Sequence, residues 1–431
     1  MEKILINGGN MLDGVVEVSG TKNAALAIIF ATILVKDICI IENLPVINDV
    51  TLSLEILQAM GIKIRMLTKN IIEIDSRNVI GGSSPLELVR KMRASYYLLG
   101  AELGRFNRAY VGYPGGCDIG ARPIDYHIKG FEALGVTVNI EGGYVEAIAE
   151  KGLKGNNIYF DSSTVGGTIN VILAATKAKG TTIIENAARE PHVVDLANFL
   201  NTCGAKISGA GTDTIKIRGV EKLHGCNYAI IPDMIEAGTY MIAAAATCGN
   251  LRINNVIPKH LESISAKLEE MGVSVTEHDD YVIVTRSNKL NRVNIKTLPY
   301  PGFPTDLQPQ MCILLCLADG VSILTESIFE SRFKYVKELE RMGASIKVEG
   351  RSAIIEGGLP LSGAQVKALD LRAGVAMVIA GLVAKGVTEI DDIYHIDRGY
   401  DNIIGKLCNV GADIKKLYVP DVASKDYKLH G

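Results

Sequence analysis

A unit of about 70 residues recurs six times along the chain, and this repetition constrains the fold more than any other feature. In each copy a short segment of apolar and polar residues ends at a glycine, and a segment with alternating apolar residues follows. Because glycine suits the left-handed residue that ends a helix, and alternation is typical of a strand, each copy predicts a helix followed by a strand. The glycines, separated by 74, 69, 68, 71 and 68 residues, are Gly61, Gly135, Gly204, Gly272, Gly343 and Gly411.

A second helix, apolar and mostly alanine-rich, recurs in the same rhythm. Since it is apolar on nearly every face, we expect it to be buried, whereas the helices that end at the repeated glycines carry polar stripes and should lie outside. Three repeats bury three such helices together, so six repeats predict two α/β domains. The buried helices are expected at residues 24–34, 94–103, 167–177, 236–247, 307–318 and 373–384.

Length and charge narrow the functional classes. A chain of 431 residues suggests two or three domains. Lys and Arg number 45 against 48 Asp and Glu, giving a net charge of −3 with no basic run, so we expect neither nucleic acid nor a membrane surface as a partner. The longest apolar stretch, residues 24–35, is shorter than the roughly 20 residues that span a bilayer.

The start of the chain and the cysteines indicate a cytoplasmic protein. Residues 1–5 lack the basic and apolar pattern of a secretory signal. The eight cysteines are scattered and include no CxxC pair, so the spacing predicts reduced thiols and neither a disulfide framework nor a metal site.

Polar and charged residues that could bind a ligand or take part in catalysis gather just before the buried helices. A helix N-terminus offers free N–H groups and a partial positive charge, which suit an anion. Thr164, Asp233 and similar residues there are equally well explained as ordinary N-caps. Lys22, Arg93 and Arg372 are harder to explain in that way because the helix dipole disfavours them, so they suggest a bound anion.

The segment 112–123 is rich in glycine and proline, which predicts a shaped surface loop. It carries Cys117, with Arg122 nearby. A cation stabilises a thiolate, so this setting favours a reactive thiol, although most cysteines are inert and buried. The residues alone leave both interpretations open.

Taken together, these motifs resemble the UDP-N-acetylglucosamine enolpyruvyl transferase family over nearly the whole chain. The resemblance implies the enolpyruvyl transferase fold, a two-domain inside-out α/β barrel built from six βαβ-type units. It implies a domain at residues 22–230 with the cysteine loop, a second at 1–21 and 231–418 with the catalytic aspartate, and a C-terminal tail at 419–431. The matching segments are 19–24, 92–95, 114–117, 120–123, 185–191, 303–306, 361–364, 370–372 and 395–400.

The resemblance also implies a reaction, the first committed step of peptidoglycan synthesis. The enolpyruvyl group of phosphoenolpyruvate would pass to the 3-hydroxyl of UDP-N-acetylglucosamine by addition and elimination, releasing phosphate. Cys117 would protonate carbon 3 and Asp306 would accept the hydroxyl proton, with Lys22 and Arg398 as catalytic cations. No metal, cofactor or obligate protein partner is expected.

The resemblance assigns contacts to both substrates. Phosphoenolpyruvate would be bound by Lys22, Asn23, Arg122, Arg372 and Arg398, since arginine suits bidentate contacts to phosphate and carboxylate. UDP-N-acetylglucosamine would be bound by Asn23, Arg93, Arg122, Pro123, Ile124, Asp125, Tyr126, Thr164, Val165, Gly166, Asp306 and Ile328.

Three alternatives are weighed against this interpretation. A synthase acting on shikimate 3-phosphate would share the fold and much of the cation set, but neither the Cys117 loop nor the segment Arg122-Pro123 is expected of it. A catalytically silent nucleotide-sugar-binding homologue would have no need to retain Cys117, Asp306 and Lys22 together. An RNA-modifying enzyme would require a basic face that the composition does not predict.

Overall fold

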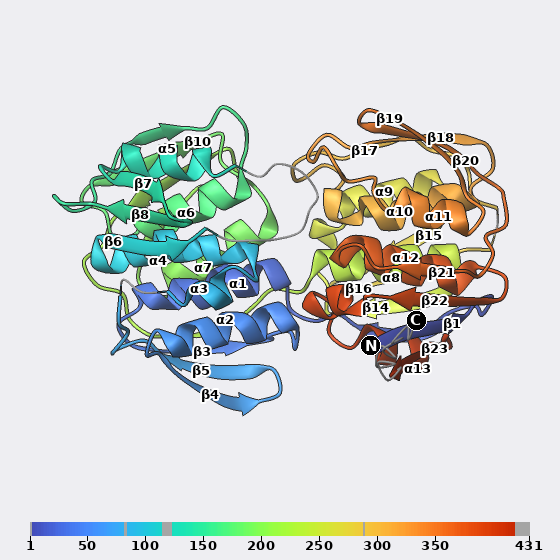
Figure 1. Ribbon diagram of the computed structural model, residues 1–431, viewed down its shortest axis with the longest axis horizontal. Helices are drawn as coiled ribbons and strands as arrows, with labels where there is room; N and C mark the ends of the chain where they lie inside the picture. Colours follow the sequence, from blue (N-terminus) through green and yellow to red (C-terminus); the bar gives the residue numbers. More distant parts are fainter. Residues whose placement is uncertain (1, 82–83, 114–122, 288, 419–431) are drawn as a thin grey trace, which may run out of the picture.

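Two hydrophobic cores lie side by side in the computed structural model, which describes residues 2–81, 84–113, 123–287 and 289–418 (Figure 1). The core of the N-terminal lobe runs from Ala24 to Ile230. The core of the C-terminal lobe combines Ile4 to Val18 with Ile235 to Ile414. The chain therefore begins in the C-terminal lobe, builds the N-terminal lobe, and then returns.

One apolar helix per repeat is buried, as the sequence predicts. Nearly every residue of these helices is inaccessible to solvent, because none has a polar face to expose. The second begins a few residues later than expected, since a 3-10 turn, η2 (Arg93–Tyr96), precedes it. The helices are α1 (Lys22–Ala31), α4 (Tyr97–Phe106), α6 (Val165–Ala175), α8 (Met234–Ala246), α10 (Gln308–Leu317) and α12 (Leu371–Val383).

A second helix of each repeat has both buried and exposed residues, in keeping with its predicted polar stripe. The six repeated glycines that follow these helices have φ angles of 84° to 99°, so each is left-handed as expected. The helices are α2 (Asn48–Ala59), α5 (Asp125–Ala133), α7 (Pro191–Thr202), α9 (Glu262–Glu270), α11 (Val336–Arg341) and α13 (Ile403–Asn409).

Six small sheets surround the buried helices (Figure 1). In each, a run of antiparallel neighbours alternates buried and exposed residues, with the buried side chains facing the helices. In five of them a short strand from elsewhere adds in parallel at one edge.

The strands of the N-terminal lobe form three sheets. They are β13 (Asn227–Ala229), β3 (Ile38–Glu42), β5 (Ile71–Asp75) and β4 (Lys63–Thr68); β6 (Arg108–Gly112), β8 (Tyr144–Ile148) and β7 (Thr137–Glu141); and β11 (Lys206–Ser208), β12 (Thr214–Arg218), β10 (Thr181–Glu185) and β9 (Asn157–Tyr159).

The strands of the C-terminal lobe form the other three. They are β15 (Ser274–Glu277), β16 (Tyr281–Thr285), β14 (Asn250–Asn254) and β2 (Asp13–Glu17); β17 (Ile295–Lys296), β18 (Val321–Thr325), β20 (Ser352–Glu356) and β19 (Ser345–Glu349); and β21 (Gln365–Lys367), β22 (Val387–Asp391), β1 (Glu2–Asn7) and β23 (Asp413–Tyr418). The start of the chain thus completes a sheet with its end.

The two chain passages between the lobes run side by side. Thr21 donates its backbone N–H to Ile231 O at 2.8 Å and its hydroxyl to Pro232 O at 2.7 Å. Gly20 lets the first passage lie directly against Asn43, since a Cβ there would lie 1.8 Å from Asn43 O. The pairing holds the start of α1 next to the start of α8.

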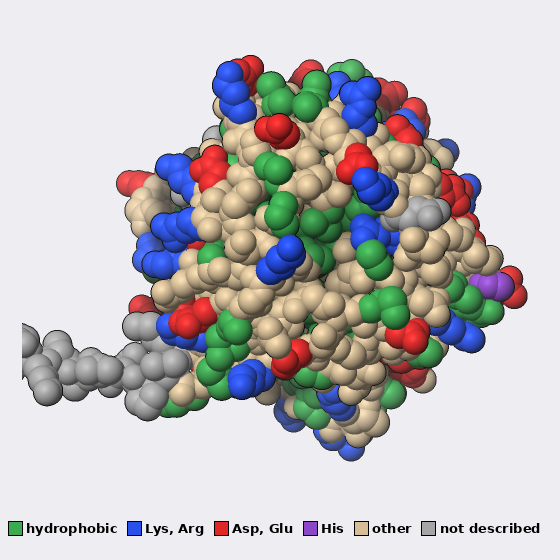
Figure 2. Space-filling view, turned by 90° about the vertical axis from the view of Figure 1, so that its right-hand side faces the viewer, with side chains coloured by type: hydrophobic (Ala, Val, Ile, Leu, Met, Phe, Trp, Pro, Cys, Tyr) green, Lys and Arg blue, Asp and Glu red, His purple; other side chains and the backbone are tan. Residues whose placement is uncertain are grey.

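The surface of the C-terminal lobe carries acidic and basic side chains interspersed over the face seen in Figure 2. Across the described ranges, no helix is both long and apolar enough to span a membrane.

Candidate functional site

A cavity of about 510 Å³ lies between the lobes, and the starts of all six buried helices line it. The positive ends of these helix dipoles therefore converge on one space, which favours a bound anion. The contributing residues are Lys22 and Asn23 of α1, Arg93 of η2, Val165 and Gly166 of α6, Met234 and Ile235 of α8, Thr305 and Asp306 of η4 (Thr305–Leu307), and Leu371 and Arg372 of α12.

Three of the polar residues before these helices are ordinary caps. Thr164 Oγ1 accepts from Gly167 N at 3.3 Å, and Asp233 Oδ1 accepts from Ile235 N at 2.7 Å. Asp370 Oδ1 accepts from the backbone N–H groups of the first turn of α12. The capping explanation that the sequence left open thus holds for these three.

Lys22 and Arg398 are held by one buried carboxylate. Lys22 Nζ lies 2.7 Å from Asp49 Oδ2, and Arg398 Nε lies 2.9 Å from Asp49 Oδ1. Burial alone would raise the pKa of Asp49, but the two cations outweigh it and hold the pKa below its usual value. Burial also lowers the pKa of Lys22. Because Arg398 belongs to the other lobe, this cluster joins the two.

Asp306 lies between two arginines of its own lobe and caps no helix. Its Oδ2 is 2.9 Å from Arg372 Nη2, and its Oδ1 is 3.3 Å from Arg332 Nη2. Both guanidinium groups are almost fully buried. Burial works to raise the pKa of Asp306, yet the charges of Arg372 and Arg332 hold it well below the usual range. Asp306 is therefore an ionised carboxylate aimed at the cavity.

Most of the residues that the sequence predicted for the site line this one cavity. They are Lys22, Asn23, Arg93, Pro123, Thr164, Val165, Gly166, Asp306, Ile328, Arg372 and Arg398. Cys117 and Arg122 lie outside the described residues.

Three predicted nucleotide contacts do not line the cavity. Ile124 is buried in the core of the N-terminal lobe, and Asp125 is exposed at the start of α5. Tyr126 packs edge-on against Phe160, with ring centroids 5.7 Å apart, so its partly buried ring lies against the core of the N-terminal lobe.

His127 lines the cavity as a neutral side chain. Its Nδ1 lies 2.8 Å from Asn170 Nδ2, which leaves Nδ1 as the acceptor. Burial, aided by the charge of Arg93, lowers the pKa of His127 to about 4. The imidazole lies against Gly166, where a Cβ would come within 2.8 Å of Nε2.

Two further acidic residues line the cavity: Asp49, which had no signal in the sequence, and Glu190, which lies in the matching segment 185–191. Asp49 sits in the first turn of α2, where an acidic residue is common on any helix, so only its distant partners reveal its role. Glu190 precedes Pro191 at the start of α7, and its Oε1 accepts from Tyr300 N of the other lobe at 3.4 Å. Its Oε2 is buried without a partner, and burial raises the pKa of Glu190.

Comparisons with known proteins find relatives over nearly the whole chain. The sequence profile of EPSP synthase (3-phosphoshikimate 1-carboxyvinyltransferase) matches residues 6–407. UDP-N-acetylglucosamine 1-carboxyvinyltransferase 3 of Caldanaerobacter subterraneus subsp. tengcongensis is 58% identical over 97% of this chain and all of its own. UDP-N-acetylglucosamine 1-carboxyvinyltransferase of Clostridium botulinum is 60% identical over the same shares.

Solved structures give the same fold. The enolpyruvyl transferase NikO from Streptomyces tendae superimposes with a TM-score of 0.87 at 27% identity, over 97% of this chain and 99% of its own. EPSP synthase from Acinetobacter baumannii gives 0.76 at 19% identity, over 97% and 100%, which shows the fold alone.

The six-sheet architecture is therefore that of the enolpyruvyl transferases. Within that class, the chain belongs to the UDP-N-acetylglucosamine 1-carboxyvinyltransferase family.

Proposed function

We propose that the chain transfers the enolpyruvyl group of phosphoenolpyruvate to the 3-hydroxyl of UDP-N-acetylglucosamine and releases phosphate, the first committed step of peptidoglycan synthesis. One observation carries the proposal: six helix starts, Lys22 and several arginines converge on one cavity, in a chain that is 58% and 60% identical to two UDP-N-acetylglucosamine 1-carboxyvinyltransferases.

The charges of the cavity suit phosphoenolpyruvate. Lys22 and Arg398 come from different lobes and reach one point, while Arg372 lies at the start of α12. Arginine binds phosphate and carboxylate with two parallel hydrogen bonds, and the converging helix dipoles add to this attraction. Arg122, outside the described residues, is expected to complete the set.

Asp306 is proposed as the general base. The sugar 3-hydroxyl would attack carbon 2 of phosphoenolpyruvate, giving its proton to Asp306, while carbon 3 takes a proton. Since Arg372 and Arg332 keep the pKa of Asp306 low, the carboxylate is ready to accept but is weakly basic. If the incoming anion draws Arg372 away, that pKa rises and the proton transfer becomes easier.

Cys117 is proposed as the acid that protonates carbon 3. The tetrahedral adduct would then lose phosphate from carbon 2 and a proton from carbon 3, which restores the double bond as an enol ether. The support for this role is the sequence motif, in which glycine residues and Arg122 favour a reactive thiol.

The nucleotide sugar is proposed to lie along the start of α6, between Pro123 and Ile328. Thr164, Val165 and Gly166 present backbone N–H groups there, which suit a diphosphate. Contacts from residues 124–126 would involve the backbone or the exposed Asp125 rather than the side chain of Ile124, which is buried.

We further propose that the two cores correspond to domains at 22–230 and at 1–21 with 231–418, the tail 419–431 lying outside the described residues. A cytoplasmic location is proposed with it, supported by the free thiols of the described cysteines.

The rate of phosphate release tests the proposal. The purified enzyme is given phosphoenolpyruvate with either UDP-N-acetylglucosamine or shikimate 3-phosphate. We expect sustained phosphate release only when the acceptor is UDP-N-acetylglucosamine. Phosphate release with shikimate 3-phosphate would establish the rival synthase. If neither acceptor led to phosphate release, the chain would be a catalytically silent homologue.

A further inference from the structure

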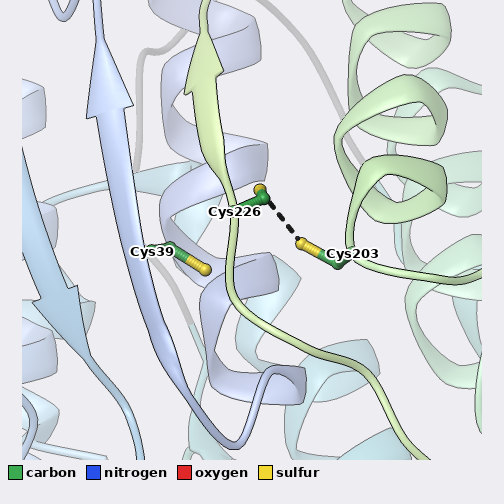
Figure 3. Close-up of side chains that lie close together, drawn as sticks. All are labelled: Cys39, Cys203 and Cys226. Carbon is green, nitrogen blue, oxygen red and sulfur yellow. Dashed lines mark hydrogen bonds between the residues drawn. The ribbon is translucent and has the colours of Figure 1, made fainter.

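Three cysteines that are far apart in the sequence meet in the N-terminal lobe, away from the cavity. Figure 3 shows Cys39 on strand β3, Cys203 at the end of α7 and Cys226 just before β13. Their sulfur atoms all lie within 4.8 Å of one another, and those of Cys203 and Cys226 are 3.3 Å apart. None of the three lines the interlobe cavity.

The backbone holds the three residues in this arrangement. His224 N donates to Cys203 O at 2.9 Å, and Ile40 N donates to Cys226 O at 2.9 Å. Between them, Gly225 N donates to Asp37 Oδ2 at 2.9 Å. A Cβ at Gly225 would lie 1.9 Å from Ile38 O, so only glycine allows the segment to approach β3 this closely. The cluster is therefore preorganised by neighbouring secondary structure rather than by the sulfur atoms themselves.

The spacing suits a thiophilic metal ion. A zinc-sized cation about 2.3 Å from each sulfur holds the sulfur atoms roughly 3.8–4.0 Å apart. The observed separations, from 3.3 Å to no more than 4.8 Å, bracket that range, so side-chain shifts of under about 1 Å would form the site. The partial exposure of Cys226 gives an entry path, while Cys39 and Cys203 are buried.

We propose that Cys39, Cys203 and Cys226 form a three-thiolate site for a soft d¹⁰ cation, either Zn²⁺ or Cu⁺. Thiolates select these ions over Mg²⁺ and Ca²⁺. The sequence spacing predicts no such site because the ligands come from three separate segments, and only the fold brings them together.

Metal binding to this cluster should also release protons. Only the thiolate form of cysteine ligates a metal ion, so a cation that binds here takes the place of the thiol protons.

A bound ion would stabilise the start of the second chain passage between the lobes. Strand β13 follows Cys226 directly and leads to Ile230. The carbonyl oxygen of Ile230 accepts from Asn43 Nδ2 at 2.8 Å. A bound ion would therefore tie β3, α7 and β13 together and stabilise the N-terminal lobe. At a free ion concentration 100-fold above its dissociation constant, the melting temperature should rise by roughly 5–10 °C.

Metal binding by matched cysteine variants tests the proposal. All chains carry Cys117→Ser, so that the loop thiol supplies no ligand, and are kept reduced and oxygen-free. Zn²⁺ and Cu⁺ are titrated separately against a competing chelator. We expect one equivalent of one of the two ions in the parent chain and in Cys408→Ser, an exposed thiol of the other lobe, and none in Cys226→Ser or Cys203→Ser.

A second readout, made on the parent chain, does not depend on how well the variants fold. Co²⁺ bound by thiolates gives an intense sulfur-to-metal charge-transfer absorption, which the parent chain should show and Cys226→Ser should lose. Failure to bind either Zn²⁺ or Cu⁺ stoichiometrically would overturn the proposal. So would equal binding by Cys226→Ser, or a purified chain in which Cys203 and Cys226 are found by mass to be joined as a disulfide.

Discussion

Two carboxylates, Asp49 and Asp306, hold the cations that are proposed to bind phosphoenolpyruvate. Asp49 holds Lys22 and Arg398, and Asp306 holds Arg372. Each carboxylate is kept ionised by its partners in spite of burial. If phosphoenolpyruvate binds these cations as proposed, its anionic groups compete with the two carboxylates for them, which would couple substrate binding to the state of the proposed general base.

Replacing the proposed base should affect turnover more than binding. Asp306→Asn keeps the size and the hydrogen-bonding capacity but removes the basic oxygen. We expect turnover to fall by about 10²–10⁴-fold, with a much smaller change in the dissociation constant of UDP-N-acetylglucosamine. Steady-state kinetics and calorimetry would separate the two effects, and near-normal turnover would show that another residue takes the proton.

Reactivity should single out Cys117 among the eight thiols. Cys248 and Cys408 are exposed, so accessibility alone predicts that they too are modified, whereas a stabilised thiolate at Cys117 should react first. We expect limited alkylation, or treatment with the epoxide fosfomycin, to modify Cys117 with parallel loss of activity. Peptide mass spectrometry locates the adduct. First modification of Cys248 or Cys408, or full activity with Cys117 capped, would contradict this role.

The neutral state of His127 gives a stability that depends on pH. Its pKa is about 4 in the folded chain against 6.5 unfolded, so the contribution is complete above pH 6.5 and is lost as pH falls toward 4. The loss amounts to about 3 kcal/mol. In His127→Gln this part of the acid sensitivity should disappear. The difference in unfolding free energy between the unmodified chain and His127→Gln should therefore narrow from pH 7 to pH 4. Parallel curves would show that His127 does not titrate in this way.

At the level of helices and strands, the sequence predicted the architecture well. The six buried helices were found from their all-round apolar character, and the six glycines from the polar helices that precede them. Periodicity is a local property, so it survives in a single sequence. The prediction did not separate the 3-10 turn η2 from α4, because 3-10 turns are frequent at the ends of α-helices and the sequence pattern predicts the two as one helix.

A single repeated glycine can test the helix–glycine–strand unit. Gly135 has a φ of 85° and no atom within 4 Å of where a Cβ would lie, so Gly135→Ala introduces backbone strain without a clash. We expect the free energy of unfolding to fall by about 1–2 kcal/mol, and Gly135→Asn, which tolerates the left-handed region, to lose less. Denaturant unfolding measures both, and an unchanged Gly135→Ala chain would contradict the assigned role.

Across the whole molecule, long-range pairing is what the sequence alone does not reveal. Strands β1 and β2 complete sheets of the C-terminal lobe with partners more than two hundred residues away, and Asp49 meets Arg398 across the lobes. The three cysteines of the proposed metal site meet in the same way. The candidate residues were found because motifs mark them one by one, but their common cavity follows only from the packing of six helix starts.

The claim that both lobes build one substrate site is tested most directly by amide hydrogen exchange with and without UDP-N-acetylglucosamine at saturation. If the nucleotide sugar binds between the lobes, exchange should slow at residues 164–167 of the N-terminal lobe and at residues 304–307 and 328 of the C-terminal lobe in the same experiment. Protection confined to one lobe, or found only outside the cavity, would contradict the shared site.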